Sequence, residues 1–177
     1  YSFTNGNLGV WNSGLWRGTI SSLRMGTGKW YAEMKITGTN VQNGVLFGVG
    51  TGNAITTKNM SNPNYGNASY QADGYEKVAA NTSKQTNGAA STGYGTAMVE
   101  NDIGMIAFDG INGTIWTGVN GTWDNSATSS EITAGTTTNA MYSGLSMAAT
   151  NVGDGSYVFT TSIQGSAVTG VCNWNYG

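Results

Sequence analysis

The sequence predicts a single all-β domain, an antiparallel β-sandwich, and three observations support this. The 177 residues include 28 Gly and one Pro, and a chain rich in Gly, Asn, Thr and Ser disfavours helices and favours strands joined by tight polar turns. Short apolar runs recur between Gly-rich turns at intervals of about 8–12 residues, which is typical of a sandwich or barrel. Six Trp, nine Tyr and four Phe supply large side chains for a core and argue against disorder. The length suits one domain over residues 1–177, since domains commonly have ~100–200 residues.

The clearest strand of the first half covers residues 29–37. Its apolar face carries Trp30, Ala32, Met34 and Ile36, and polar residues alternate with them. A period of two with one polar face indicates a half-buried strand. The other predicted strands of this half are residues 20–25, 45–49, 74–80 and 82–86. Surface loops are expected at residues 52–70, which are rich in Asn, and at residues 89–95.

The second half is predicted to be a series of hairpins. Residues 109–113 are dense in turn-forming types, and Asn120-Gly121 is a strong hairpin signal because both residues tolerate positive φ. The predicted strands are residues 103–108, 114–119, 141–148, 157–163 and 168–176. Residues 126–139 are expected to form a polar loop. No helix is expected, since no stretch keeps apolar residues at helical spacing over three turns.

Four stretches, in this order, resemble the strand motifs of SPRY domains. GKWYAEMKI at 28–36 resembles the family's GKWYWEVTI strand, and VLFGVG at 45–50 resembles the strand that follows it. NDIGMIAFD at 101–109 resembles GDVIGVALD, and NGTIWTGVNG at 112–121 resembles NGTIWFYKNG. NYG at 175–177 resembles the NFG that closes many phage copies, so the resemblance covers residues 21–177.

The resemblance implies a SPRY-like, concanavalin-like architecture of two packed antiparallel sheets, with ligands held by loops at one rim. The composition is similar to that of the Gly-, Asn- and Thr-rich copies in tail, fibre or capsid-decoration proteins of tailed phages. We therefore expect a virion location, on the surface of an extracellular particle. The chain begins with Tyr, so we expect a fragment of a longer polypeptide. It would form a homo-oligomer or contact other virion proteins.

Charge is sparse, which limits the classes of partner. Only 9% of the residues are charged, against roughly 25% in ordinary soluble domains. The seven basic residues are scattered and form no dense stripe, so no nucleic-acid partner is expected. Membrane-surface binding is disfavoured for the same reason, and no segment is apolar enough for insertion as a helix.

The residue types also restrict catalysis. The sequence contains no His, which excludes Ser–His and Cys–His nucleophile systems and the usual zinc sites. A glycosidase needs two carboxylates ~5–9 Å apart, and the sequence pairs none of its nine acidic residues. Residues 109–113 faintly resemble a calcium loop, but Ile111 stands where a ligand is needed, so a hairpin turn is favoured. Cys172 is interpreted as a small buried side chain. No catalytic residue, metal or cofactor is expected.

The aromatic residues divide into core and candidate binding residues. Apolar strand runs place four of them in the core: Trp30, Phe47, Phe108 and Phe159. Trp116 and Trp123 lie on or just after a hairpin. Exposed aromatics among Asn and Asp suit the apolar faces of sugars and also protein contacts. The candidate binding residues are Tyr65, Tyr70, Asp73 and Trp123.

Three functions remain open from the sequence. The leading hypothesis is a non-catalytic virion-surface module, in a phage tail, fibre or capsid, that recognises a host-surface glycan or protein. The alternative is a structural decoration or assembly protein without a host ligand, in which the aromatics would be buried between subunits. The third and remote hypothesis is a polysaccharide-degrading enzyme, which requires a carboxylate pair in a groove.

Overall fold

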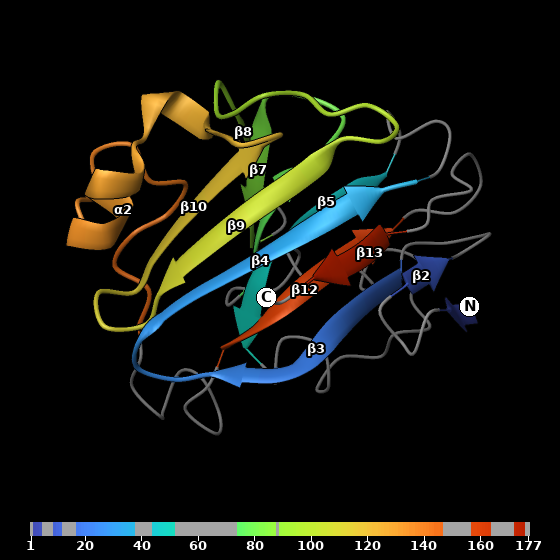
Figure 1. The fold of residues 1–177 in the computed structure, drawn as a ribbon, viewed down its shortest axis with the longest axis horizontal. Coiled ribbons are helices and arrows are strands. Elements are labelled where there is room, and N and C mark those ends of the chain that lie inside the picture. Colours follow the sequence, from blue (N-terminus) through green and yellow to red (C-terminus); the bar gives the residue numbers. More distant parts are fainter. Residues whose placement is uncertain are drawn as a thin grey trace.

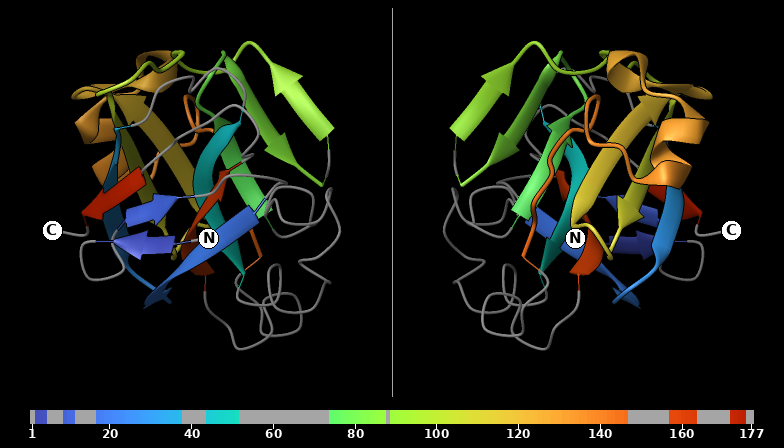
Figure 2. Two further views of the ribbon diagram at one scale, coloured as in Figure 1. Left: turned by 90° about the vertical axis from the view of Figure 1, so that its right-hand side faces the viewer. Right: turned by 90° about the vertical axis from the view of Figure 1, so that its left-hand side faces the viewer.

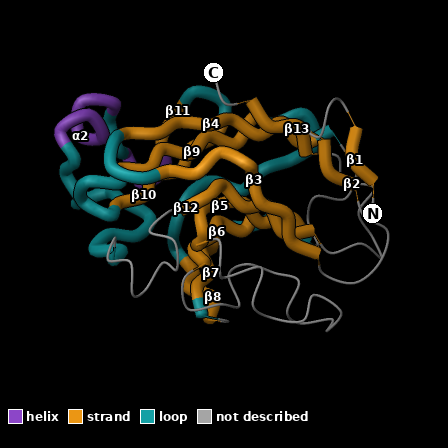
Figure 3. Tube along the Cα trace, turned by 90° about the horizontal axis from the view of Figure 1, so that it is seen from below, coloured by secondary structure: helices purple, strands orange, loops and turns teal. Residues whose placement is uncertain are grey.

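The computed structural model describes residues 2–4, 9–11, 17–37, 44–51, 74–87, 89–146, 157–163 and 172–175. These residues form two sheets stacked face to face, as the views in Figures 1 and 3 show. All the strand pairs in both sheets are antiparallel. The predicted antiparallel β-sandwich is therefore confirmed. No helix in the described part of the chain is long and apolar enough to cross a bilayer.

The first sheet has seven strands in the order β1-β2-β13-β4-β9-β10-β11. Their bounds are β1 Ser2–Thr4, β2 Gly9–Trp11, β13 Cys172–Asn175, β4 Lys29–Ile36, β9 Ile103–Asp109, β10 Thr114–Val119 and β11 Thr122–Trp123. The second sheet has six strands in the order β3-β12-β5-β6-β7-β8. Their bounds are β3 Arg17–Met25, β12 Tyr157–Ile163, β5 Val45–Thr51, β6 Gly74–Val78, β7 Ser83–Thr86 and β8 Ala89–Thr92.

The main core lies between the sheets, and it follows from the alternation of strands such as β4. Ala32, Met34 and Ile36 are fully buried, as predicted. Phe108 on β9 packs against Tyr157 on β12, with 5.2 Å between the ring centroids. Phe47 and Phe159 are also buried as predicted. Trp30 is the exception, because it is only partly buried at the margin of this cluster, next to the turn before β4.

A buried ion pair ties the two sheets together. The Lys77 ammonium on β6 lies 2.8 Å from the Asp124 carboxylate, and both side chains are fully buried. Asp124 begins the 3-10 helix η3 (Asp124–Ser126) directly after β11. Its carboxylate also accepts hydrogen bonds from the Thr117 hydroxyl and the Thr96 backbone N–H, each at 2.8 Å. These donors satisfy the buried charge, which would otherwise be costly in the interior.

The predicted hairpin turns are present. Asn120 and Gly121 have φ values of 50° and 83° between β10 and β11, the left-handed conformation expected for this pair. In the turn between β9 and β10, the Asp109 carboxylate accepts the backbone N–H groups of Ile111 and Asn112 at 2.9 and 3.2 Å. Residues 109–113 therefore form a turn closed by an Asp side chain, as the turn interpretation requires.

Three sequence expectations are wrong. Residues 89–92 form β8 rather than a loop, because they pair antiparallel with β7 despite their weak strand signal. The expected absence of helix fails at α2 (Ser129–Ala134), which lies inside the predicted loop 126–139. The predicted strand 141–148 makes only an isolated bridge between Tyr142 and Ile115 in its described part. Some parts of these predictions lie outside the described residues: the loop 52–70, residues 147–148 of one strand, residues 168–171 and 176 of another, and the Cys172 side chain.

Candidate functional site

The strongest candidate site lies on the outer face of the seven-stranded sheet, beneath α2. Figure 2 shows α2 on the side of that sheet that faces away from β7 and β8. The strand register brings Tyr31 on β4 opposite Ala107 on β9, and Ala107 opposite Trp116 on β10. Trp123 on β11, two strands beyond β9, lies opposite Gly118 on β10. Residues far apart in the sequence therefore meet as one aromatic surface.

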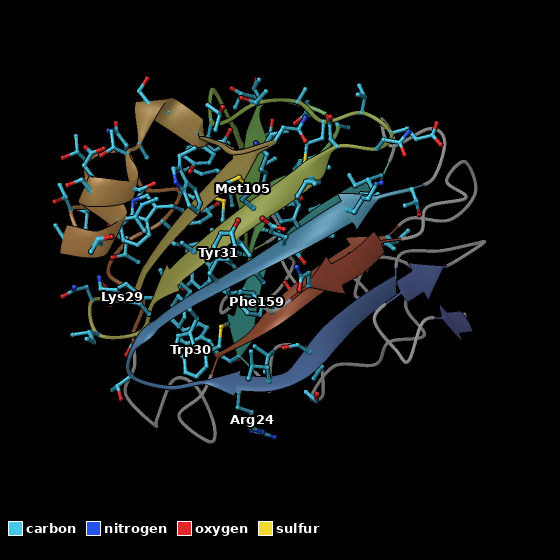
Figure 4. All side chains as sticks on the ribbon, in the orientation of Figure 1. Arg24, Lys29, Trp30, Tyr31, Met105 and Phe159 are labelled. Atoms are coloured by element: carbon cyan, nitrogen blue, oxygen red, sulfur yellow. The ribbon has the colours of Figure 1, made fainter. Side chains whose placement is uncertain are left out.

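These side chains line a half-open cavity of about 240 Å³, called the outer pocket below. Its aromatic walls are Tyr31, Trp116 and Trp123, and the small Ala107 leaves the space between them. Ile132 of α2 also lines it, so the short helix covers one side. In Figure 4 the labelled Tyr31 and Met105 lie over the near face of this sheet, on β4 and β9.

The two tryptophans and the tyrosine of the outer pocket differ in exposure and hydrogen bonding. Tyr31 is 42% exposed, and its ring meets that of Trp123 edge-on at 6.1 Å. Trp123 is partly buried, and its indole N–H donates to the Ser129 hydroxyl of α2 at 3.3 Å. Trp116 is fully buried, and among the described residues no acceptor contacts its Nε1 atom. The Nε1 atom is itself buried, so Trp116 contributes the packed floor of the pocket rather than a donor that a ligand can reach.

One end of the outer pocket is polar. The Asp109 carboxylate is 1% exposed and accepts the Lys29 ammonium at 2.9 Å and the Asn112 side-chain amide at 2.9 Å. The Lys29 ammonium also donates to the Ile132 carbonyl of α2 at 3.2 Å. Burial on its own would raise the pKa of Asp109, but the hydrogen bonds from Lys29, Asn112 and the turn backbone lower it overall. Asp109 therefore stays ionised, and its charge is compensated within the site.

The helix above the pocket forms because its ends are capped. The Thr128 hydroxyl accepts the Glu131 backbone N–H at 3.1 Å, and the Glu131 carboxylate accepts the Thr128 N–H at 2.7 Å. This reciprocal capping box starts the helix. Gly135, at φ 76°, ends it in the left-handed conformation. Lys29 then joins the helix to the sheet through the Ile132 carbonyl.

The chemistry of the outer pocket suits binding better than catalysis. Asp109 is the one carboxylate among the residues that line it in the described structure, and a lowered pKa makes it a poor general acid. Burial, followed by the hydrogen bond to Glu33 and the charge of Glu33, raises the pKa of Tyr31, so its phenol stays protonated. No group of three or more His, Cys, Asp or Glu side chains within the described ranges could hold a metal ion.

Of the predicted binding residues, Trp123 lies at the outer pocket. Tyr65, Tyr70 and Asp73 lie outside the described residues, so their candidacy stays a prediction. The prediction overlooked Tyr31. Its sequence signal is a large aromatic residue on the polar face of an alternating strand, where a small or charged residue would suffice.

Comparisons with known proteins support the fold. No protein-family model matches the sequence. No curated protein matches it either. Among solved structures, the SPRY domain of human HERC1 superposes with a TM-score of 0.65 at 15% sequence identity, covering 92% of this chain and 83% of that chain. This chain therefore has a SPRY-like β-sandwich fold.

Proposed function

We propose that this domain is a non-catalytic binding module on the surface of a virion, such as a phage tail fibre or capsid. Its ligand would be a host-surface glycan, held at the outer pocket. The observation that carries the proposal is the edge-on contact between Tyr31 and Trp123, both partly exposed, at a cavity that Trp116 also lines. Convergent aromatic walls with a few polar groups are typical of binding sites.

A glycan fits this surface better than a charged ligand. Sugar rings offer apolar C–H faces to aromatic side chains and hydroxyls to polar ones. The charges at the outer pocket are already matched, because Lys29 lies 2.9 Å from Asp109. An anionic or cationic ligand would have to compete with this pair. A neutral ligand would leave it intact.

A virion setting is supported by composition and by the sequence resemblance to phage SPRY copies. The surface carries few charges, since 9% of all residues are charged. Binding that relies on shape and hydrogen bonds is then less sensitive to salt than binding through charge. On a particle, several copies would bind at once, so the particle could attach stably to a host cell even if each single site binds weakly.

A glycan array screened with the fluorescently labelled domain, assembled as multimers, tests the proposal. We expect selective binding that falls at least about tenfold in Tyr31→Ala and in Trp123→Ala, since stacking contacts contribute most of such interactions. Val99→Ala is the matched control, because Val99 is 58% exposed and does not line the pocket. Binding to no glycan, or equal binding by all variants, would exclude the glycan site. If binding to host cells persists after their glycans are removed and is lost after their surface is digested with a protease, the ligand is a host-surface protein and not a glycan.

The alternative, a structural assembly or decoration protein, is favoured by one observation. β8 ends the six-stranded sheet in the described structure, and its four residues Ala89–Thr92 are all exposed and uncharged. Exposed strand edges without charge or Pro can pair with a strand of another chain. A particle reconstruction with β8 and the outer pocket both buried against neighbours would favour assembly over host recognition.

A further inference from the structure

The buried ion pair between the two sheets holds an amine and a carboxyl group in contact and away from water. Lys77 Nζ lies 2.8 Å from Asp124 Oδ2, and both side chains are fully buried. The carboxyl carbon is one bond, about 1.2 Å, from that oxygen, so it lies within about 4 Å of the nitrogen. Reacting groups held this close behave as if each were present at a very high concentration. The pair therefore has the proximity that condensation to an amide requires.

Burial favours the neutral, reactive form of this pair. Desolvation lowers the pKa of Lys77, and it outweighs the charge and the hydrogen bond of Asp124, which act in the opposite direction. Transfer of one proton from Nζ to Oδ2 removes two charges from an interior in which charge is costly. The result is a free amine, the nucleophilic form of lysine, beside a carboxylic acid.

The two oxygens of Asp124 have different partners, and these partners suit different roles in the reaction. Oδ2 faces Lys77 and also accepts the Thr117 hydroxyl at 2.8 Å, so it is placed to take up protons and leave. Oδ1 accepts the Thr96 backbone N–H at 2.8 Å. A backbone N–H in this position stabilises the negative charge that develops on a carboxyl oxygen during attack.

The backbone at Gly95 closes the site over the reacting atoms. A Cβ at this position would collide with Lys77 Nζ and would lie 2.8 Å from Asp124 Oδ2. Such close packing leaves the amine no room to turn away from the carboxyl group. We propose that Lys77 and Asp124 form an isopeptide bond once the domain has folded.

The reaction balances without any further reactant. Nζ attacks the carboxyl carbon of Asp124, so a carbon–nitrogen bond forms and the bond from that carbon to Oδ2 breaks. Nζ gives up two protons in all, and Oδ2 carries both away as one water molecule. Oδ1 remains as the amide oxygen, and nothing is oxidised or reduced. The bond joins β6 of one sheet to η3, which follows β11 of the other, and it does not depend on the proposed glycan binding.

Mass spectrometry of the whole domain tests the proposal, because the bond removes one water. After prolonged incubation of the folded domain at neutral pH, we expect an intact mass lower than the sequence mass by one water. A proteolytic digest should contain a branched peptide that joins residues 77 and 124. The full sequence mass, or a loss of water without that peptide, would overturn the proposal.

A second ion pair is an internal control for the role of burial. Lys29 Nζ and Asp109 Oδ2 lie 2.9 Å apart, but the Lys29 side chain is 44% exposed. No peptide that joins residues 29 and 109 is therefore expected, and an equal yield of it would contradict the role given to burial.

Two lysine variants identify the amine that reacts. Lys77→Arg keeps a positive charge beside Asp124 but removes the primary amine, so this variant should retain the full sequence mass. Lys35→Arg is the matched control, since Lys35 is exposed, and it should lose one water as the parent does. A Lys77→Arg protein that still loses water would refute the assignment. If Lys77→Arg does not fold, the digest of the unmodified domain decides.

Discussion

Replacing Asp109 with Asn tests whether one buried carboxylate holds both the β9–β10 turn and the helix above the outer pocket. The Asn carbonyl can still accept the backbone N–H groups of Ile111 and Asn112. Its amide nitrogen would then face the Lys29 ammonium and the Asn112 side-chain amide, which are both donors. Two favourable contacts would become repulsive ones. The Lys29 tether to α2 would be lost with them.

The expected loss of stability follows from these two contacts. The hydrogen bond from Asn112 to the buried carboxylate contributes about 1.5–3 kcal/mol. Lys29 has a 44% exposed side chain, so its ion pair adds at most about 1 kcal/mol. Asp109→Asn should therefore lower the free energy of unfolding by about 1.5–4 kcal/mol, which corresponds to a Tm lower by about 3–16 °C for a domain of this size.

The pH dependence gives a second, independent readout by calorimetry. The pKa of Asp109 is lower in the folded protein than in the unfolded chain. Its stabilisation is therefore present above about pH 4, the ordinary Asp value, and is lost as the pH falls through the folded pKa. The difference in Tm between the parent and Asp109→Asn should shrink below pH 4. Glu100→Gln, at an exposed position, should change stability by less than about 0.5 kcal/mol. A difference under 1 kcal/mol at pH 7, or one that persists unchanged in acid, would refute the reasoning.

Four further outcomes are expected. Lys77→Met leaves the buried Asp124 carboxylate without its counter-ion and should cost about 3–5 kcal/mol in chemical denaturation; a loss below 1 kcal/mol would contradict it. Thr128→Ala removes the helix cap and should cost about 1 kcal/mol, with faster amide exchange in α2 than in β9; unchanged exchange would argue against the cap. Gly135→Ala places an Ala in the left-handed conformation, with its Cβ 2.7 Å from Asn112 Nδ2. The free energy of unfolding should fall by about 1–2 kcal/mol in thermal denaturation, and an unchanged stability would be inconsistent with this contact. Burial, and then the neighbouring Tyr75, raise the pKa of Tyr142 to about 12, so its contribution to stability is complete below about pH 10 and fades as the pH rises towards 12. Ultraviolet titration of Tyr142→Phe against the parent checks this, and an ordinary titration near pH 10 would disprove it.

Strand periodicity made most of the fold predictable. β4 was predictable because apolar residues alternate with polar ones along it. The three apolar residues Ala32, Met34 and Ile36 are fully buried in the structure. β8 was not, because Ala89–Thr92 are small and exposed and become a strand only by pairing with β7. α2 is six residues long, too short for helical periodicity to be visible. Its capping residues Thr128 and Glu131 nevertheless carry a readable local signal.

The outer pocket was only partly predictable. Trp123 was a candidate because it follows a hairpin, but nothing local relates it to Tyr31. Their proximity depends on the register of β4, β9, β10 and β11, which brings together residues about 90 positions apart. Register is set by tertiary pairing and by the turns between strands. The unsatisfied state of Trp116 depends on that same arrangement and has no sequence signal.

The strand order of the seven-stranded sheet also fixes how the domain can be presented. β1 and β11 lie at opposite ends of the order, separated by five strands, which is a distance on the order of 30 Å at the usual spacing between neighbouring strands. A support joined to the chain at β1 would leave the β11 edge, with Tyr31 and Trp123 near it, directed away from the attachment point. Immobilisation through the amino end should therefore keep the pocket accessible in a sensor experiment. Coupling the domain to the sensor through its lysines would modify Lys29 and block the outer pocket, which Lys29 lines.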